Sequence, residues 1–376
     1  MSEPSFTIGM EEEYLLVDRT SRELVGDPPP AMLAECESLL AGQVSPEFLR
    51  SQIEVGTRIC RSTAEARADL ARLRATVAEV AGRYDMAPIA AASHPFADWE
   101  AQKPTDRARY VTLHRDMQGV ARRLIICGLH VHVGLDDDEL RIDLMNQVRY
   151  FLPHLLALST SSPFWDGEDT GLNSYRVSVF DAMPRTGLPD QFESWGEYRR
   201  HIDVLTGVGL IEDATKLWWD VRPSERFPTL EMRITDICTR LDDSIAVAAL
   251  YRCILRMLWR LKRNNQRWRI YARMLIDENR WRAQRYGFDH GLVDFGRREI
   301  VAYKDLLEEI LALVAEDAAH FGCAAEIAHA RTILQRGTSV HAQRRVFEAA
   351  IAGGAAKRAG LEAVVDWLIE ETQRDL

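Results

Sequence analysis

The chain has neither an excess of basic residues nor a long uncharged apolar run. Its 47 lysines and arginines are outnumbered by 57 aspartates and glutamates, which gives a net charge of −10 at pH 7. A groove that neutralises many phosphates needs a basic surplus, so this balance argues against nucleic acid as the main partner. The most apolar helical stretch, 245–261, is interrupted by Arg252, Arg256 and Arg260, which excludes a membrane span.

Closely spaced cysteine pairs of the CxxC type are also absent. The six cysteines are scattered along the chain and three lie in apolar stretches, so buried free thiols are expected. The opening residues, MSEPSFTIG, contain neither a basic n-region nor an apolar h-region, so no signal peptide is expected. These features together predict a cytoplasmic protein.

The 376 residues, 47% of them apolar, are enough to bury a large core. Up to about Asp236, short alternating segments are mixed with helical patterns, whereas the chain beyond Asp242 reads almost entirely as helix. We therefore predict one catalytic α+β domain over 1–376, with a sheet-bearing core over 1–241 and a mainly helical region over 242–376. The helices expected in that second region are 242–265, 269–286, 296–319, 324–335, 339–352 and 356–374.

Five segments of the first region have the composition of β-strands. They are 6–17, 51–59, 129–135, 217–222 and 229–237. Between them, helical patterns occupy 30–41, 63–84, 105–124, 137–158 and 194–205. Helices scattered between strands are compatible with parallel or antiparallel pairing, so the pattern leaves the strand order open.

Four of these strands have one apolar face and one charged face, because residues two apart share a face of a strand. Glu12 shares its face with Met10 and Tyr14, so it is not expected to be a ligand. The charged faces carry Glu11, Glu13, Glu54, His130, His132, Glu231 and Arg233.

If the four strands are neighbours, these carboxylates and imidazoles converge on one patch. Convergent anions repel one another unless cations neutralise them, and oxygen-rich ligands suit Mg²⁺ or Mn²⁺. Taken singly, the motifs have structural explanations: a solvated charge run at 11–13, hydrogen-bonded histidines at His130 and His132, and an ion pair of Glu231 with Arg233. Their recurrence in one chain favours a shared site.

Three segments resemble strands of the glutamate–cysteine ligase and glutamine synthetase superfamily. Gly9–Asp18 is similar to its G-x-E-x-E strand, Gly128–Gly134 to its G-x-H-x-H strand, and Leu230–Asp236 to its E-x-R-x-x-D strand. Further segments resemble the type 2 glutamate–cysteine ligase family, also called carboxylate–amine ligases. These are Ser161–Trp165, Asp169–Gly171, Ser174–Arg176, Arg222–Ser224, Glu278–Trp281 and Arg285–Gly287.

The resemblance implies a glutamine synthetase/glutamate–cysteine ligase-like fold, in which a curved antiparallel sheet is backed by covering helices and followed by a helical C-terminal third. It implies an ATP-dependent carboxylate–amine ligase that forms an amide through an acyl-phosphate. The expected substrates are glutamate with cysteine or a related amine, together with ATP and Mg²⁺. A homodimer is also expected by analogy with the family.

The resemblance also implies roles for individual residues. His132 would lie near the nucleotide, and Arg233 would contact both nucleotide and transferring phosphoryl group. Arg176 and Arg222 are the catalytic-site candidates for binding the acceptor's carboxylates, with structural ion pairs as the competing explanation. The implied metal ligands are Glu11, Glu13, Glu54, His130 and Glu231.

A metal-dependent amidase or hydrolase is the alternative, with His130, His132 and the glutamates activating water. It predicts bound Zn²⁺ and no requirement for ATP. The sequence has no HExxH motif, and Glu231-x-Arg233 has no evident use in such an enzyme, so the ligase is favoured. A non-catalytic scaffold is a third possibility, against which the intact charged positions argue.

Overall fold

The computed structural model describes residues 3–376, with the side chains of residues 108, 109 and 114 left out. Its main sheet is antiparallel throughout and has the order β10-β11-β5-β1-β3-β2, with β4 also paired to β1. This arrangement confirms the α+β class and the antiparallel sheet. The strands are β1 (Ile8–Asp18), β2 (Val44–Pro46), β3 (Gln52–Gly56), β4 (Met86–Ile89), β5 (Leu129–Gly134), β10 (Val221–Pro223) and β11 (Thr229–Met232).

The register of the sheet brings the charged faces of four strands together. On one side of β1, Glu13 lies opposite Glu54 of β3, and on the other side Glu11 lies opposite His130 of β5. Strand β11 continues the row, with Glu231 opposite His132. Residues directly opposite one another in an antiparallel pair point to the same face, so these side chains share one surface.

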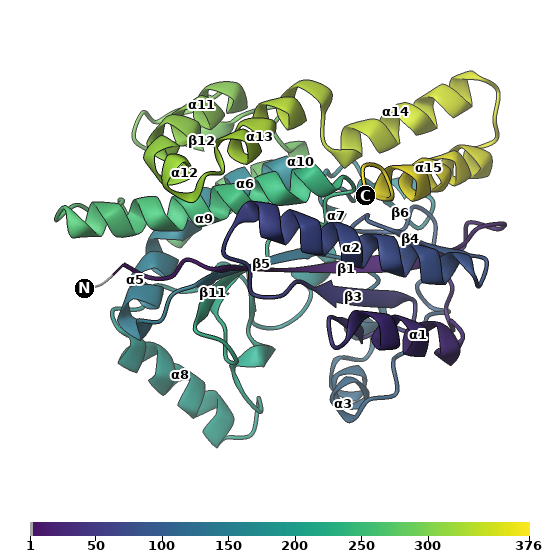
Figure 1. Cartoon of the computed structure of the whole chain (residues 1–376), viewed down its shortest axis with the longest axis horizontal. Helices are drawn as coiled ribbons and strands as arrows, with labels where there is room; N and C mark the ends of the chain where they lie inside the picture. Colours follow the sequence, from purple (N-terminus) through teal and green to yellow (C-terminus); the bar gives the residue numbers. More distant parts are fainter. Residues whose placement is uncertain (1–2) are drawn as a thin grey trace.

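The other face of the sheet is apolar and is covered by helices. Met10, Val131 and Leu230 are fully buried there. The long helix α9 (Leu241–Arg263) and α2 (Thr63–Gly82) run along this side, whereas α3 (Ala108–Met117) and α8 (Trp195–Gly207) lie on the opposite side (Figure 1). The charged face is therefore turned toward the side of the sheet on which α3 and α8 lie (Figure 1).

Glu12 joins the central strand to α2, as expected for a residue that faces away from the charged surface. Its carboxylate accepts two hydrogen bonds of 2.7 Å from the guanidinium of Arg74. The hydroxyls of Tyr14 and Ser244 donate to the same carboxylate, each at 2.6 Å. A buried ion pair is tolerated only when its remaining polar atoms are also hydrogen-bonded, and this pair meets that condition.

The second half of the chain contains one hairpin where we predicted only helix. Strands β12 (Leu292–Asp294) and β13 (Glu299–Val301) pair antiparallel, so the helix expected at 296–319 is wrong at its start. The turn is fixed by Asp294, whose carboxylate accepts from the backbone N–H groups of Gly296 and Arg297. Such a local side-chain bond competes with a helix start.

Three predicted helices are divided in the structure, one of which is the segment 296–319 that forms α11 (Tyr303–Leu313) and α12 (Ala315–Phe321) after the hairpin. The segment 105–124 forms α3 and a short α4 (Gly119–Arg122). The segment 137–158 forms α5 (Asp138–Val148), a 3₁₀ turn (Arg149–Phe151) and α6 (Leu152–Ser159). Pro153 lies in the first turn of α6, where its missing N–H costs no helical hydrogen bond.

Two predicted strands differ from the structure. The strand expected at 229–237 ends at Met232, and the strand expected at 217–222 is divided between β10 and a short β9 (Trp218–Trp219) that pairs with β8 (Thr186–Gly187) outside the main sheet. The other elements follow the expected sequence pattern to within a few residues or are too short to show a repeating pattern. They are α1 (Pro30–Leu40), β6 (Phe164–Trp165), β7 (Glu168–Asp169), α7 (Tyr175–Phe180), a 3₁₀ turn (Ala214–Lys216), α10 (Arg273–Tyr286), α13 (Ala324–Arg336), α14 (Ser339–Ala352) and α15 (Lys357–Thr372). None of the helices within 3–376 is both long and apolar enough to cross a bilayer.

Candidate active site

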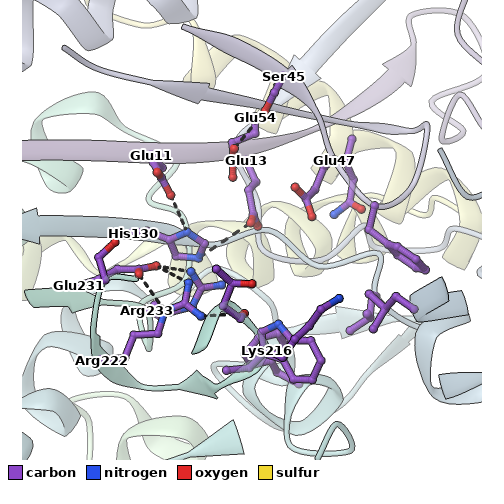
Figure 2. Close-up of a pocket in the computed structure, with 18 of the residues that line it drawn as sticks. Glu11, Glu13, Ser45, Glu47, Glu54, His130, Lys216, Arg222, Glu231 and Arg233 are labelled. Carbon is purple, nitrogen blue, oxygen red and sulfur yellow. Dashed lines mark hydrogen bonds and ion pairs between the residues drawn. The ribbon is translucent and has the colours of Figure 1, made fainter. Parts of the chain in front are cut away.

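The charged face of the sheet forms one wall of a cavity of about 550 Å³. Every residue that the sequence suggested for the site lines this cavity, and Figure 2 shows how most of them converge. They are Glu11, Glu13, Glu54, His130, His132, Arg176, Arg222, Glu231 and Arg233. Their roles remain predictions. The expectation that four strands bring the acids, the histidines and Arg233 together agrees with the structure, whereas Arg176 comes from α7 and Arg222 from β10.

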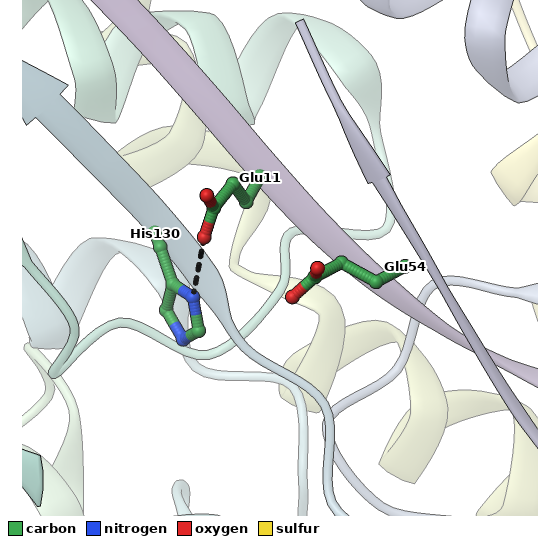
Figure 3. Close-up of side chains that lie close together, drawn as sticks. All are labelled: Glu11, Glu54 and His130. Carbon is green, nitrogen blue, oxygen red and sulfur yellow. Dashed lines mark hydrogen bonds and ion pairs between the residues drawn. The ribbon is translucent and has the colours of Figure 1, made fainter. Parts of the chain in front are cut away.

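Glu11, Glu54 and His130 form one cluster from three adjacent strands (Figure 3). Each residue offers a ligand atom within 4.8 Å of the others. The Nδ1 atom of His130 lies 3.3 Å from a carboxylate oxygen of Glu11. Two carboxylates and an imidazole nitrogen at this spacing are a donor set that a divalent cation could bridge.

A second cluster lies toward β11 and contains Glu11, His132 and Glu231. The Nε2 atom of His132 is 3.5 Å from Glu11 and 4.0 Å from Glu231. On its other side, His132 Nδ1 lies 2.9 Å from the hydroxyl of Thr229. That contact orients the ring so that Nε2 faces the two carboxylates.

The third cluster consists of Glu13, Glu47 and Glu54. Glu47 was not predicted from the sequence. It follows directly after β2, a strand of three residues that is too short to show an alternating pattern. The hydroxyl of Ser45 donates to Glu54 at 3.2 Å, so β2 contributes twice to this end of the site.

Burial and mutual repulsion raise the pKa values of two of these carboxyl groups. Burial, together with the negative charge of Glu47, raises the pKa of Glu13 to about 7. Burial and the charges of Glu47, Glu11 and Glu13 raise the pKa of Glu54 well above its usual range. Carboxyl groups held together in this way retain protons unless a cation neutralises them.

The groups nearer β11 are shifted in the other direction. Burial lowers the pKa of His130 to about 4, with the positive charge of Arg233 acting in the same sense. Burial alone would raise the pKa of Glu231, but Arg222 and Arg233 outweigh it and hold that pKa well below its usual range. His130 is therefore neutral and able to bind a metal, while Glu231 is a carboxylate.

The donor set fits hard divalent cations. Among the described residues the three clusters supply carboxylate oxygens and imidazole nitrogens but no thiolate, and neighbouring clusters share Glu11 or Glu54. Mg²⁺ and Mn²⁺ prefer such oxygen-rich sets, whereas structural zinc sites more often contain cysteine. All six cysteines are free and buried, as expected, and none belongs to these clusters.

The three arginines of the site are already hydrogen-bonded to the protein. Arg222 donates to both oxygens of Glu231, at 2.9 and 3.3 Å, and Arg233 contacts the same carboxylate. Arg176 donates to the backbone carbonyls of Arg233 and Ile234, both at 3.1 Å. Their predicted contacts with substrate would have to coexist with these bonds or replace them.

The family-like segments around Ser162 and Asp236 build the support for Arg176. The carboxylate of Asp236 accepts from the hydroxyls of Ser162 and Ser174, at 2.8 and 2.7 Å. The Ser162 hydroxyl in turn accepts the backbone N–H of Arg176 at 3.1 Å. Asp236 thus joins the strand region after β11 to the start of α7, and it does not line the cavity itself.

Gly128 leaves the space in which two site residues approach the sheet. A Cβ atom at this position would overlap the guanidinium of Arg176 and lie 3.1 Å from His130 Nε2. The backbone N–H of Gly128 donates to the carboxylate of Glu13 at 2.7 Å. The first position of the G-x-H-x-H pattern therefore has a steric role and a hydrogen-bonding role.

Solved structures of low sequence identity have the same fold. A glutamate–cysteine ligase of Francisella tularensis, solved in complex with AMP, superposes with a TM-score of 0.69 at 14% identity, covering 100% of this chain and 90% of that one. A bifunctional glutathione synthetase of Pasteurella multocida gives a TM-score of 0.68 at 15% identity. The alignment covers 98% of this chain but 53% of that enzyme, so the chain spans about half of its length.

Sequence relatives match over nearly the whole chain. A protein of Rhodospirillum rubrum named "Putative glutamate--cysteine ligase 2" is 63% identical over 376 residues, which is 99% of this chain and 97% of the relative. A protein of the same name from a Jannaschia species is 52% identical over 375 residues, covering 100% and 99%. The family model described as glutamate-cysteine ligase family 2 matches residues 7–365, and the chain therefore belongs to that family.

Proposed function

We propose that the protein is an ATP-dependent carboxylate–amine ligase that activates a carboxylate as an acyl-phosphate and joins it to an amine. The observation that carries the proposal is a single cavity in which three acidic clusters lie beside Arg222 and Arg233. Phosphoryl transfer between anions requires acids that recruit divalent cations and a positive charge beside the reacting oxyanions. Membership of a ligase family supports the same conclusion.

In the first step, an oxygen of the substrate carboxylate attacks the γ-phosphorus of ATP. A P–O bond forms to the carboxylate, the bond to the bridging oxygen of ADP breaks, and ADP leaves with the electron pair. The reactants are all anions, so the barrier falls when positive charge surrounds them. Arg233, a partly exposed residue beside Glu231 at the cavity wall, is the residue we assign to the transferring phosphoryl group.

In the second step, the nitrogen of the amine attacks the acyl carbon. The C–O bond to phosphate breaks, inorganic phosphate leaves, and the nitrogen loses one proton as the amide forms. Phosphate is a far better leaving group than oxide, which is why ATP is consumed. The cavity supplies proton acceptors, but the geometry favours none of them as the base for the amine.

The metal ions in this proposal are Mg²⁺, with Mn²⁺ as a substitute. The residues that would hold them are Glu11, Glu13, Glu54, His130 and Glu231. Glu47 is added to this set because it lies in one cluster with Glu13 and Glu54. A bound divalent cation supplies positive charge to the phosphate oxygens of ATP. His132, with Nε2 facing Glu11 and Glu231, would lie at the same phosphates.

The substrates that we propose are glutamate and cysteine, or glutamate and a related amine. The names of the relatives support them. A metal-dependent hydrolase is not favoured, because the family and the structural neighbours named above are ligases.

The test is product formation by the purified protein with ATP, Mg²⁺ and glutamate, against a panel of amines that includes cysteine. We expect ADP release that depends on the amine, and a product lighter by one water than the two substrates together. Mass spectrometry of the product would identify the amine. Absence of ATP consumption with every pair would contradict the ligase proposal, and amide cleavage without ATP would support the hydrolase.

Two further expectations complete the proposal. We propose a homodimer, which light scattering would detect as a particle of twice 42.8 kDa. We also propose a cytoplasmic location, which is supported by the free, unpaired state of all six cysteines.

A further inference from the structure

Lys216 is a buried lysine in the wall of the cavity that the sequence did not single out. It ends the 3₁₀ turn Ala214–Lys216 and is 7% exposed. It lines the same cavity as Glu11, Glu13 and Glu231, and in Figure 2 it reaches in from the side opposite Glu47 and Glu54. Lysines are almost never buried unless their charge has a partner.

The charge of Lys216 has only a weak partner within the protein. Among the described residues, its ammonium forms one ion pair, at 3.3 Å, with Glu212. The side chain of Glu212 is 62% exposed and does not line the cavity. Ion pairs with an exposed partner contribute little, so Lys216 can exchange this contact for an anionic ligand at small cost.

The backbone around Lys216 is fixed by two arginines. Arg222 donates through one guanidinium nitrogen to the carbonyls on either side of Lys216, those of Thr215 at 3.0 Å and Leu217 at 2.7 Å. Arg185 donates to the carbonyl of Lys216 itself at 3.1 Å. A side chain on a backbone held in this way loses less entropy when it binds a ligand.

The same guanidinium connects Lys216 to the acidic clusters. The remaining nitrogens of Arg222 donate to both oxygens of Glu231, which belongs to the cluster with Glu11 and His132. Arg222 therefore sets the distance between Glu231 and the 3₁₀ turn. Because its donors are occupied by Glu231, Thr215 and Leu217, Arg222 is better suited to positioning Lys216 than to binding a carboxylate itself.

We propose that the ammonium of Lys216 binds an oxyanion of a reactant: a phosphate of the nucleotide or a carboxylate of the amino acid substrate. The inference rests on the proposed ligase function, since both anions are reactants in that chemistry. Three observations carry it: the lysine is buried in the cavity wall, its protein partner is exposed, and its backbone is held by the residue that pairs with Glu231.

The test compares Lys216→Met and Lys216→Arg with wild type and with Lys304→Met. Lys304 is an exposed residue of α11 outside this cavity and serves as the matched control. Calorimetry with Mg·ATP and with glutamate measures binding, and initial rates give KM for each. A charge-assisted hydrogen bond of ordinary strength predicts a loss of about 10- to 100-fold in affinity for Lys216→Met, with partial recovery in Lys216→Arg.

The affected ligand identifies the anion. A raised KM and weakened binding for ATP alone would assign the phosphate, and the same change for glutamate alone would assign the carboxylate. Wild-type affinity and KM for both ligands in Lys216→Met would overturn the inference, as would a wild type that binds neither ligand. A wild type that binds but makes no amide would contradict the proposed function while the affinities still decide the role of Lys216.

Discussion

Glu12 and Glu13 are consecutive residues of β1 whose carboxyl groups lie in opposite environments. Glu12 is fully buried and paired with Arg74, whereas Glu13 lines the cavity in one acidic cluster with Glu47 and Glu54. The alternation of a β-strand alone separates them, since neighbouring side chains point to opposite faces. The same residue type therefore stabilises the fold at one position and is available for metal binding at the next.

Glu13→Gln tests the second of these environments. We expect at least about a 100-fold loss of amide formation, because a neutral amide cannot replace a carboxylate beside the metal-bound phosphates. The free energy of unfolding of the metal-free protein should stay the same or increase, since the substitution removes a repulsive charge and can keep the bond from the Gly128 N–H. Urea denaturation and product assays check the two parts.

Glu12→Gln is the matched control on the same strand. Removing one partner of a buried ion pair costs about 3–5 kcal/mol, so the free energy of unfolding should fall by about that amount. Wild-type stability in this variant would show that the Arg74 pair contributes nothing to the fold. A loss of stability in Glu13→Gln equal to that in Glu12→Gln would make Glu13 a structural residue.

Strand β5 supplies both histidines that line the cavity, and it depends on a glycine immediately before its first residue. Gly128→Ala should reduce amide formation about 10-fold or more, because its Cβ would displace Arg176 and His130 from their positions. The control is Gly82→Ala at the end of α2, where a Cβ would meet nothing within 4 Å. Full activity in Gly128→Ala would contradict the steric role assigned here.

The elements that the sequence predicted well are those whose pattern repeats within one segment. The alternation of apolar and charged residues in 8–18 and 129–134 revealed the charged face, because a repeat of two residues is visible within a single strand. The order of the strands depends on contacts between distant segments and could not be predicted. Glu47 and Lys216 were missed because the elements beside them, a three-residue strand and a single 3₁₀ turn, are too short to show a repeating pattern.

The roles of the arginines show a second limit of sequence patterns. The E-x-R motif places Glu231 and Arg233 on one face, but it does not show which cations are already paired. Arg222 and Arg176 are hydrogen-bonded to protein groups, and that result depends on carbonyls brought in by the 3₁₀ turn and by the segment after β11. The spacing of charges within a strand contains no information on these contacts.

At the scale of the whole molecule, the acidic site makes the free energy of unfolding depend on pH and on metal binding. Between the ordinary carboxyl pKa of 4.5 and about pH 7 the native protein holds a proton on Glu13, and on Glu54 well above that ordinary pKa, while the unfolded chain has released both. When a group binds more protons in the native state than in the unfolded state, the free energy of unfolding falls as the pH rises. The low pKa of His130, about 4, adds a contribution that rises with pH, and only a small part of it remains to be gained above the ordinary histidine pKa of 6.5.

We therefore expect the melting temperature of the metal-free protein to fall between pH 6.5 and 8, and Mg²⁺ to raise it more at pH 8 than at pH 6.5. Binding of Mg²⁺ at pH 6.5 should release protons into a weakly buffered solution, because the ligands must be carboxylates. Calorimetric scans with and without Mg²⁺ measure both trends. A Mg²⁺ effect independent of pH would contradict the assignment of Glu13 and Glu54 as metal ligands.

The central claim is that a substrate carboxylate attacks ATP to form an acyl-phosphate in this cavity. Its most direct test is to supply glutamate labelled with ¹⁸O in the reacting carboxylate, together with ATP, Mg²⁺ and the accepted amine, and to measure the isotope in the products. The mechanism predicts one ¹⁸O atom transferred to each molecule of inorganic phosphate formed. Phosphate without ¹⁸O, released together with amide product, would contradict it.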